Sequence, residues 1–427
     1  MRTKSLFPAI ILLTVIFTAS AQNEWAVLDE NLIQPYELPA ILVTESGKKI
    51  TTVQEWEAER GELLTLFSEQ MYGKAPDDKL TITCKTVEQS DKALEGKAIR
   101  KQIIATFAAN GKTAEMNILI YLPKKAKQPV PVFFGLNFYG NQTVLDDPAI
   151  LTNNAYALNV NEKGIYNNKS SEAIRGIQAS RWCIERIIEE GYGVVTAYYC
   201  EIYPDHAEGK NEGIAALLSK KSGREGTLQW NAIGAWAWGI SRIMDYIETD
   251  NDIDAKKVVL FGHSRLGKTA LWAGAQDQRF AAVISNNSGC GGAALYKRKF
   301  GETALIINTY FPHWFCSQFK WYINREELLP IDQHQLIALI APRPVYIASA
   351  EDDLWADPKG EFLSAYHAGE AYNLYGLKGI ESEQMPLVNS PVGDRVGYHI
   401  RTGEHNVTLY DWECFLKFAK RVVFYEK

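Results

Sequence analysis

The stretch that decides the fold is KVVLFGHSRLGK, residues Lys257 to Lys268, which runs on into TALWAGAQ. Its apolar run Val258 to Phe261 is typical of a strand buried on both faces. The run leads into Gly262-His263-Ser264, and the residues that follow have a helical composition. A strand, a Gly-flanked serine and a helix in this order predict a nucleophile elbow, the tight turn that exposes a serine Oγ above a sheet.

The elbow departs from the pattern G-x-S-x-G in its second half. Gly267 lies three residues after Ser264, and Leu266 stands where a small residue is usual. Gly262 still allows the turn, and the strand before it and the helix after it favour Ser264 as a nucleophile over a chance Gly-x-Ser. We expect His263 to face the core or to orient the elbow, because neighbouring residues on a strand point to opposite faces.

Other segments extend this strand into a sheet. Apolar runs of the same kind occupy residues 130–138, 193–199, 281–285 and 344–350. Helical patterns at 230–247 and 410–424 alternate with or follow them, which predicts crossover connections and a parallel sheet. Strand-like alternation over 79–123 predicts an antiparallel opening. The predicted fold class is therefore α/β, a three-layer α/β-hydrolase sandwich with a mostly parallel central sheet.

The domain organisation follows from the same order of segments. We predict one α/β-hydrolase domain over residues 22–427, with an N-terminal wrap at 22–75 and a surface insertion at about 141–175. The wrap contains a predicted helix from Thr52 to Met71. The insertion is a long polar stretch between two predicted strands.

Residues 1–21 have the composition of a secretory signal peptide. Basic residues precede an apolar run from Leu6 to Phe17, and the small residues Ala19-Ser20-Ala21 follow. The run is too short to span a bilayer core of about 30 Å. We therefore predict cleavage near Gln22, a secreted or periplasmic protein and no membrane attachment after cleavage.

Charge and cysteine usage restrict the partners. A net charge of −6 argues against a nucleic-acid-binding protein, which normally has a basic face. The six cysteines show no CxxC pair and the seven histidines no HxxxH pattern, so we predict no structural metal. The serine-nucleophile mechanism that the elbow predicts requires no cofactor. We expect buried free thiols, because a chain of 427 residues does not need disulfides to be stable.

A nucleophilic serine needs a base and an acid, and α/β-hydrolases supply them in the order Ser, acid, His. Three acids, at positions 351–353, follow the predicted strand 344–350 at its carboxyl end. His405 lies in a Gly-containing loop just before the last helix, where the catalytic histidine of this fold is expected. His399 is the alternative, but its surroundings, VGYHI, could form a structural strand.

Further residues suggest an oxyanion hole and a sugar pocket. The backbone N–H of Arg265 is the expected oxyanion donor, its guanidinium can add charge, and a second donor could come from residues 135–137. Lys268, one helical turn after the serine, is equally compatible with sugar binding and with an ordinary surface position. Trp355 is expected to reach the substrate at a strand end. Trp314 and Glu302 could form a pocket wall, although glutamate in such a run is usually exposed.

The stretch Gly262 to Lys268, with arginine directly after the serine and lysine four residues after it, resembles the signature of the glucuronoyl esterases, carbohydrate esterase family fifteen. These α/β-hydrolases cleave esters between glucuronic acid on xylan and alcohols of lignin. The resemblance implies a nucleophile, an oxyanion arginine and a base at Ser264, Arg265 and His405. It implies a site for the uronic acid at Lys268, Glu302 and Trp355.

The acid separates this chain from part of that family. Fungal members carry a glutamate where this sequence has Asn287, which holds no charge. Other bacterial members resemble this chain in having an acid after the next strand, and Asp353, two residues before Trp355, matches it. Asp352 is the alternative acid.

The resemblance implies a secreted serine esterase that cleaves (4-O-methyl-)glucuronic acid esters in glucuronoxylan, including lignin–carbohydrate links, through an acyl-enzyme. Two other functions stay open. An acetyl xylan esterase would use the same triad without the uronic-acid residues. A catalytically decayed carbohydrate-binding protein would be consistent with Asn287. The sequence does not predict an oligomeric state.

Overall fold

The computed structural model describes residues 25–76, 80–126, 129–153, 155–218 and 230–424. The predicted signal peptide lies outside the described residues. Ten strands form one sheet: β1 (Thr81–Lys92), β2 (Ala98–Ala109), β3 (Lys112–Pro123), β4 (Val130–Asn137), β5 (Gly193–Tyr198), β6 (Ile253–His263), β7 (Ala282–Asn286), β8 (Val345–Ala350), β9 (Val392–Gly393) and β10 (Val396–Arg401).

The sheet is mixed but mostly parallel, as predicted. Its spatial order is β1-β2-β3-β5-β4-β6-β7-β8-β10-β9. The six strands from β5 to β10 in this order pair in parallel, while β1, β2 and β3 add an antiparallel side and β9 pairs antiparallel at the other edge. The register places His263 of β6 opposite Asn286 of β7, and Arg401 of β10 opposite Ala350 of β8. The loops that follow β6, β7, β8 and β10 therefore leave the sheet close together, at the carboxyl ends of these parallel strands.

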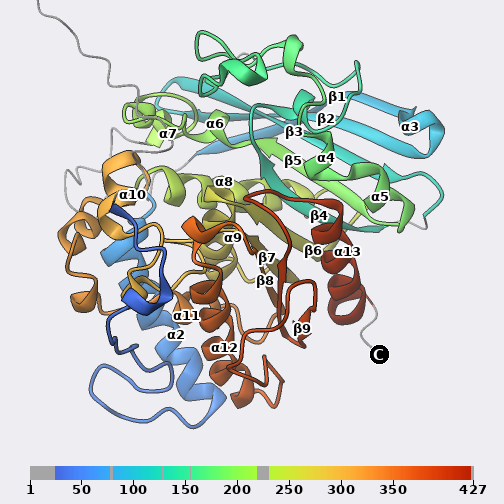
Figure 1. Cartoon of the computed structure of the whole chain (residues 1–427). Helices are drawn as coiled ribbons and strands as arrows, with labels where there is room; N and C mark the ends of the chain where they lie inside the picture. Colours follow the sequence, from blue (N-terminus) through green and yellow to red (C-terminus); the bar gives the residue numbers. More distant parts are fainter. Residues whose placement is uncertain (1–24, 77–79, 127–128, 154, 219–229, 425–427) are drawn as a thin grey trace, which may run out of the picture.

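Helices cover both faces of the sheet (Figure 1). The longer ones are α2 (Val53–Phe67), α8 (Ala232–Ile247), α9 (Arg265–Gln276), α12 (Pro358–Leu374) and α13 (Leu409–Ala419). Shorter ones are α3 (Ala93–Gly96), α4 (Ala179–Trp182), α5 (Ile184–Glu189), α6 (Tyr199–Ile202), α7 (Ala215–Leu218), α10 (Ala304–Tyr310) and α11 (Gln333–Ala338). None of the described helices is both long and apolar enough to cross a membrane.

The core has two parts, one on each face of the sheet. Val258 and Leu260 of β6 pack with the apolar faces of α8, α9, α11 and α12, while Val259 and Phe261 pack with α5 and α13. All four residues from Val258 to Phe261 are buried, as expected for a central strand in a parallel sheet. The three layers hold β6 rigidly, and the functional serine follows directly after it.

Details differ from the predicted segments. The wrap helix begins after Thr52, whose hydroxyl accepts a hydrogen bond from Glu55 N at 3.2 Å, and it changes to a π-helical turn at Ser68–Tyr72. The polar segment 141–175 lies between β4 and β5 as short 3-10 turns with a small apolar core of its own, which includes Ile165 and Ile174. All six cysteines are free, and four of them are buried as expected. The expectation is wrong for Cys84, which is exposed on the edge strand β1, and for Cys183, which is only partly buried. The division into one domain with a wrap and an insertion stays a prediction.

Candidate active site

The serine elbow forms at the junction of β6 and α9. Ser264 has φ 58° and ψ −129°, a strained conformation for a residue with a side chain, and its N–H donates to Asn286 O at 2.9 Å. A Cβ on Gly262 would lie 2.0 Å from Leu266 O, so only glycine fits there. Leu266, two residues after the serine, does not obstruct the turn, because its side chain is buried.

The structure brings one histidine and one acid together beside this elbow. His405 Nδ1 and Asp353 Oδ2 are 2.6 Å apart. The Asp353 side chain is only 4% exposed, whereas Asp352 is exposed and uses its backbone N–H to bind Gly403 O. Of the two candidate acids, Asp353 is therefore the one that contacts His405.

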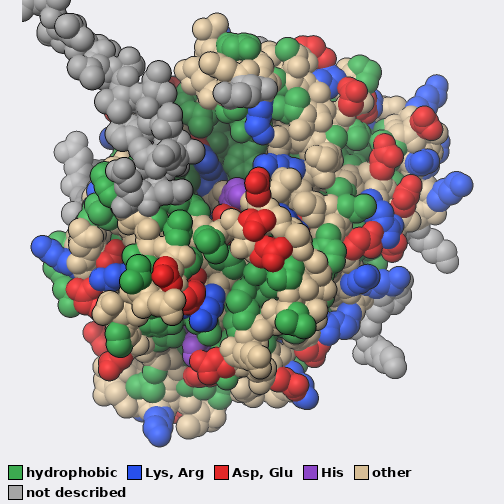
Figure 2. Space-filling view, viewed as in Figure 1, with side chains coloured by type: hydrophobic (Ala, Val, Ile, Leu, Met, Phe, Trp, Pro, Cys, Tyr) green, Lys and Arg blue, Asp and Glu red, His purple; other side chains and the backbone are tan. Residues whose placement is uncertain are grey.

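All seven predicted site residues line one cavity of about 290 Å³. They are Ser264, Arg265, Lys268, Glu302, Asp353, Trp355 and His405. Phe311 and Trp314 also line it, and residues 135–137, the predicted source of a second oxyanion donor, do not. Figure 2 shows a histidine in a hollow of the molecular surface, with basic side chains beside it and acidic ones on the adjoining rim.

The guanidinium of Arg265 is held in place by an acid that the sequence analysis missed. It forms an ion pair with the buried Asp205, and its carbon lies 4.7 Å from the centre of the Trp314 ring. Asp205 also accepts hydrogen bonds at 2.8 Å each from Tyr199, His313 and Trp314. Burial alone would raise the pKa of Asp205, but Arg265 and these donors hold it below its usual range. Asp205 could have been predicted from its position shortly after the carboxyl end of β5, where sites of α/β proteins are built.

Lys268 and Glu302 form a buried pair, so the surface positions considered for both are wrong. Lys268 Nζ donates to the carbonyl oxygens of Ser288 and Cys290 at 2.6 Å each and lies 3.3 Å from Glu302 Oε2. The Glu302 backbone N–H donates to Trp355 O at 3.0 Å. The lysine ammonium thus donates to three protein acceptors. Its positive charge compensates the Glu302 carboxylate, which lies at the cavity wall.

The two other histidines near the sheet edge have different surroundings. His399 is fully buried between Asp411 and the Tyr346 hydroxyl, at 3.0 Å from each, and it does not line the cavity. His263 is buried, as expected, and the centre of its ring lies 4.6 Å from that of His405. Burial and the neighbouring His405 keep the pKa of His263 well below its usual value.

In the part of the chain that the structure describes, no three histidine, cysteine or acidic side chains gather in a way that could hold a metal ion. The chemistry of the cavity is instead that of a nucleophile, a base with an acid behind it, and a cation. A serine beside a histidine whose second nitrogen binds a carboxylate is the arrangement of serine hydrolases.

Comparison with known proteins agrees with this chemistry. Residues 223–376 match the family model of fungal glucuronyl esterases. A carbohydrate esterase from an unknown prokaryotic organism is 49% identical over 396 residues, which cover 92% of this chain and 90% of that protein. A solved structure, a promiscuous CE15 esterase from a marine bacterial metagenome, has a TM-score of 0.88 at 47% identity over 93% of this chain and 100% of that one.

The chain belongs to carbohydrate esterase family 15. A glucuronoyl esterase from Solibacter usitatus also matches, with a TM-score of 0.86 and 45% identity over 92% of this chain and 100% of that one. The chain is accordingly a carboxylic-ester hydrolase of the glucuronoyl esterase type. The resemblance seen in Gly262 to Lys268 is confirmed, and so is the predicted α/β-hydrolase fold.

Proposed function

We propose that this family 15 esterase cleaves esters of (4-O-methyl-)glucuronic acid in glucuronoxylan, including lignin–carbohydrate ester links, with Ser264, His405 and Asp353 as its catalytic triad. The observation that carries the proposal is the 2.6 Å contact between His405 Nδ1 and Asp353 in the cavity that Ser264 also lines. A base with a fixed tautomer beside an elbow serine is what an acyl-enzyme mechanism needs.

In the first half-reaction, Ser264 Oγ attacks the ester carbonyl and His405 Nε2 takes its proton. Asp353 binds Nδ1–H of His405, which keeps Nε2 free as the acceptor and stabilises the imidazolium. The tetrahedral intermediate collapses when the alcohol leaves with the proton from His405. Water then attacks the acyl-enzyme while His405 takes one of its protons. The second tetrahedral intermediate collapses when His405 gives this proton to Ser264 Oγ, which releases the uronic acid and restores the serine.

Negative charge develops on the carbonyl oxygen at both tetrahedral stages. The backbone N–H of Arg265 follows the nucleophile and is the expected donor. The guanidinium adds positive charge at the cavity wall, where Asp205 and the Trp314 ring hold it. Because this cation is preorganised, little rearrangement is needed when the oxyanion forms.

The acid side of the ester would occupy the part of the cavity lined by Lys268, Glu302 and Trp355. The Glu302 carboxylate can accept hydrogen bonds from sugar hydroxyls, and Lys268 compensates its charge. Trp355 offers a flat apolar face and an N–H donor, which suit a sugar ring. The composition of residues 1–21 supports export, so the proposed location is the periplasm or the outside of the cell.

Acetyl ester hydrolysis is a second candidate, since the solved relative at 47% identity is described as promiscuous. An acetyl group would need only the triad and the oxyanion donors. Such a substrate would make no contact with the Lys268 and Glu302 pair.

The test compares rates on benzyl glucuronate, 4-nitrophenyl acetate and acetylated xylan for the wild type, Ser264→Ala and the exposed control Ser390→Ala. We expect a strong preference for the glucuronate and loss of activity in Ser264→Ala. Ser390→Ala should keep wild-type activity. Preference for acetate would move the substrate to acetyl esters with the triad intact. Activity that survives in Ser264→Ala would overturn the nucleophile.

A further inference from the structure

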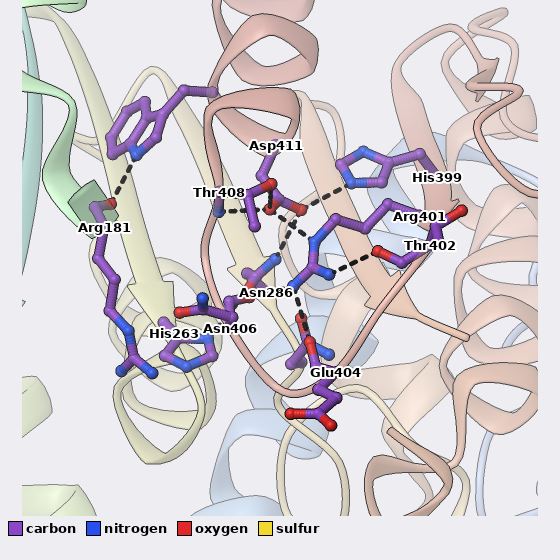
Figure 3. A network of polar contacts seen from close by, with 12 residues as sticks. Arg181, His263, Asn286, His399, Arg401, Thr402, Glu404, Asn406, Thr408 and Asp411 are labelled. Atoms are coloured by element: carbon purple, nitrogen blue, oxygen red, sulfur yellow. Dashed lines mark hydrogen bonds and ion pairs between the residues drawn. The ribbon is translucent and has the colours of Figure 1, made fainter. Parts of the chain in front are cut away.

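One buried arginine binds the loop that carries His405 on both sides of this histidine. Arg401 ends β10, and its side chain is 4% exposed. Its two terminal nitrogens donate to three backbone carbonyl oxygens: Thr402 O at 2.9 Å, Glu404 O at 2.9 Å and Asn406 O at 2.7 Å (Figure 3). The guanidinium therefore fixes the backbone immediately before and immediately after His405.

The arginine is itself anchored by a carboxylate. Arg401 Nε donates to Asp411 Oδ2 at 2.8 Å, and Asp411 is fully buried at the start of α13. Asp411 also accepts hydrogen bonds from the backbone and hydroxyl of Thr408, at 2.7 Å each, and from His399 at 3.0 Å. Both carboxylate oxygens of Asp411 therefore accept hydrogen bonds, which fixes the orientation of the carboxylate. The Arg401 guanidinium that is paired with it has little freedom to move.

The same carboxylate is connected to the serine elbow. Asn286 Nδ2 donates to Asp411 at 3.2 Å, which leaves its Oδ1 as the acceptor for His263 Nδ1 at 2.6 Å. The Asn286 carbonyl accepts the Ser264 N–H, and the His263 ring packs on the His405 ring. The Arg401 and Asp411 pair thus links the loop of the proposed base to the turn of the proposed nucleophile.

The His405 side chain is held by Asp353 and by the His263 ring, whereas the backbone on both sides of it depends on Arg401. His405 is 41% exposed, and Gly403 has φ +100°, a conformation that gives the chain a sharp turn without side-chain packing. Apart from Arg401, the described contacts that reach residues 402–406 include the Asp352 N–H on Gly403 O and the Asn389 side chain on Thr402. The contacts of Asp352 and Asn389 reach residues before His405. Arg401 also binds Asn406 O, directly after His405.

We infer that Arg401 is a positioning residue of the esterase: held by Asp411, it fixes the loop 402–406 so that His405 stays in register with Ser264 and Asp353. The inference rests on the proposed function, since it takes His405 as the catalytic base. Loss of the guanidinium frees three carbonyls at once and leaves the base to sample positions away from the reaction path. A displacement of about 1 Å at a catalytic group can cost about 100-fold in rate.

The test is Arg401→Lys, which keeps a cation for Asp411 but cannot span three carbonyls. A matched control exists in Arg343, a second arginine that donates to three carbonyls, those of Gly274, Asp277 and Phe280. Arg343 precedes β8, at the end of the strand opposite the site. The same change, Arg343→Lys, therefore perturbs a comparable set of bonds away from His405.

The readout is kcat per active site on 4-nitrophenyl acetate, with sites counted by titration with a fluorophosphonate that labels Ser264. We expect kcat per titrated site to fall about 100-fold in Arg401→Lys with KM changed less than about twofold, and to be unchanged in Arg343→Lys. A merely structural role would lower the number of titrated sites and leave kcat per site at the wild-type value, which would overturn the inference.

Two further variants separate the possible failures. Arg401→Gln keeps one donor for Asp411 and serves if Arg401→Lys does not fold. Failure of both to fold, with Arg343→Lys folded, would assign Arg401 a structural role and overturn the inference. Full activity of His405→Ala would instead overturn the proposed function, whereas wild-type kcat in Arg401→Lys beside an inactive His405→Ala overturns the positioning role alone.

Discussion

Asn287 donates a hydrogen bond from Nδ2 to Asp353 Oδ2 at 2.8 Å. The same oxygen binds His405 Nδ1, so two donors converge on it. Asn287 stands where the resemblance places the catalytic glutamate of fungal members. The amide at this position cannot act as an acid, but here it orients the acid supplied by the next strand.

We therefore predict that Asn287→Ala lowers kcat without preventing folding. A hydrogen bond to a charged group contributes about 1.5–3 kcal/mol, which corresponds to about a ten- to hundredfold loss if all of it is expressed in the transition state. Steady-state kinetics on benzyl glucuronate would measure it. A wild-type kcat in a folded Asn287→Ala variant would show that His405 alone suffices to orient Asp353.

The triad acid itself can be assigned with a matched pair of substitutions. Asp353→Asn should reduce kcat by about 10⁴-fold, as the equivalent change does in a serine protease, because the amide stabilises the wrong histidine tautomer. Asp352→Asn changes the neighbouring acid, which is exposed, and should leave kcat unchanged. The reverse order of effects in the two variants would assign Asp352 as the acid.

The sequence was most informative where the signal is local. The elbow around Ser264 is a contiguous strand, turn and helix, and His405 has a fixed place between a strand and the last helix, so both positions could be predicted from neighbouring residues. The choice of Asp353 over Asp352 needed the family resemblance, since both follow the same strand. The structure adds that only Asp353 turns inward to the histidine.

Pairings between distant segments could not be predicted. Arg265 and Asp205 are 60 residues apart, and Lys268 and Glu302 are 34 apart. Nothing in the local composition around Glu302 distinguishes a buried glutamate from an exposed one. Its burial depends on Lys268 of α9, which offsets the cost of removing the carboxylate from water.

A buried carboxyl behind the cavity should make stability depend on pH. Glu361 of α12 accepts hydrogen bonds from Ser288 N at 2.7 Å, Gly289 N at 2.9 Å and Ser349 Oγ at 2.6 Å. Burial outweighs these bonds and raises the pKa of Glu361 to about 8. A carboxyl in the unfolded chain has a pKa of about 4.3, so between these values the folded state binds the extra proton.

The sign follows from proton uptake. The contribution of Glu361 to the free energy of unfolding is complete below pH of about 4 and declines as the pH rises towards 8, by up to about 1.4 kcal/mol per pH unit. Glu361→Gln keeps acceptor and donor groups of the same shape and cannot ionise. We expect its Tm to fall less than that of the wild type between pH 5 and pH 8 in thermal melts. Parallel curves for the two proteins would contradict the raised pKa.

The two glycines of the elbow should respond differently to alanine, because different atoms face them. A Cβ on Gly262 meets the backbone of α9, at 2.0 Å from Leu266 O and 2.8 Å from Gly267 N. A Cβ on Gly267 would lie 3.0 Å from both Ser285 Oγ and Ser288 Cβ and 3.2 Å from the backbone oxygen of Gly262, so all its contacts are longer than those at Gly262. The first clash can be relieved only if the first turn of α9 moves, and that turn shapes the serine elbow.

We predict that Gly262→Ala abolishes esterase activity and lowers the Tm, since accommodating the methyl group distorts the elbow and overpacking of a core costs about 1–3 kcal/mol even where side chains can adjust. Gly267→Ala should fold and keep activity within about tenfold of the wild type, because shifts of a few tenths of an ångström at Ser285, Ser288 and Gly262 O relieve its contacts. Thermal melts and kcat on 4-nitrophenyl acetate test both variants. Equal losses would mean that the second glycine is as strictly required as the first, and that its shift from the G-x-S-x-G position carries a constraint of its own.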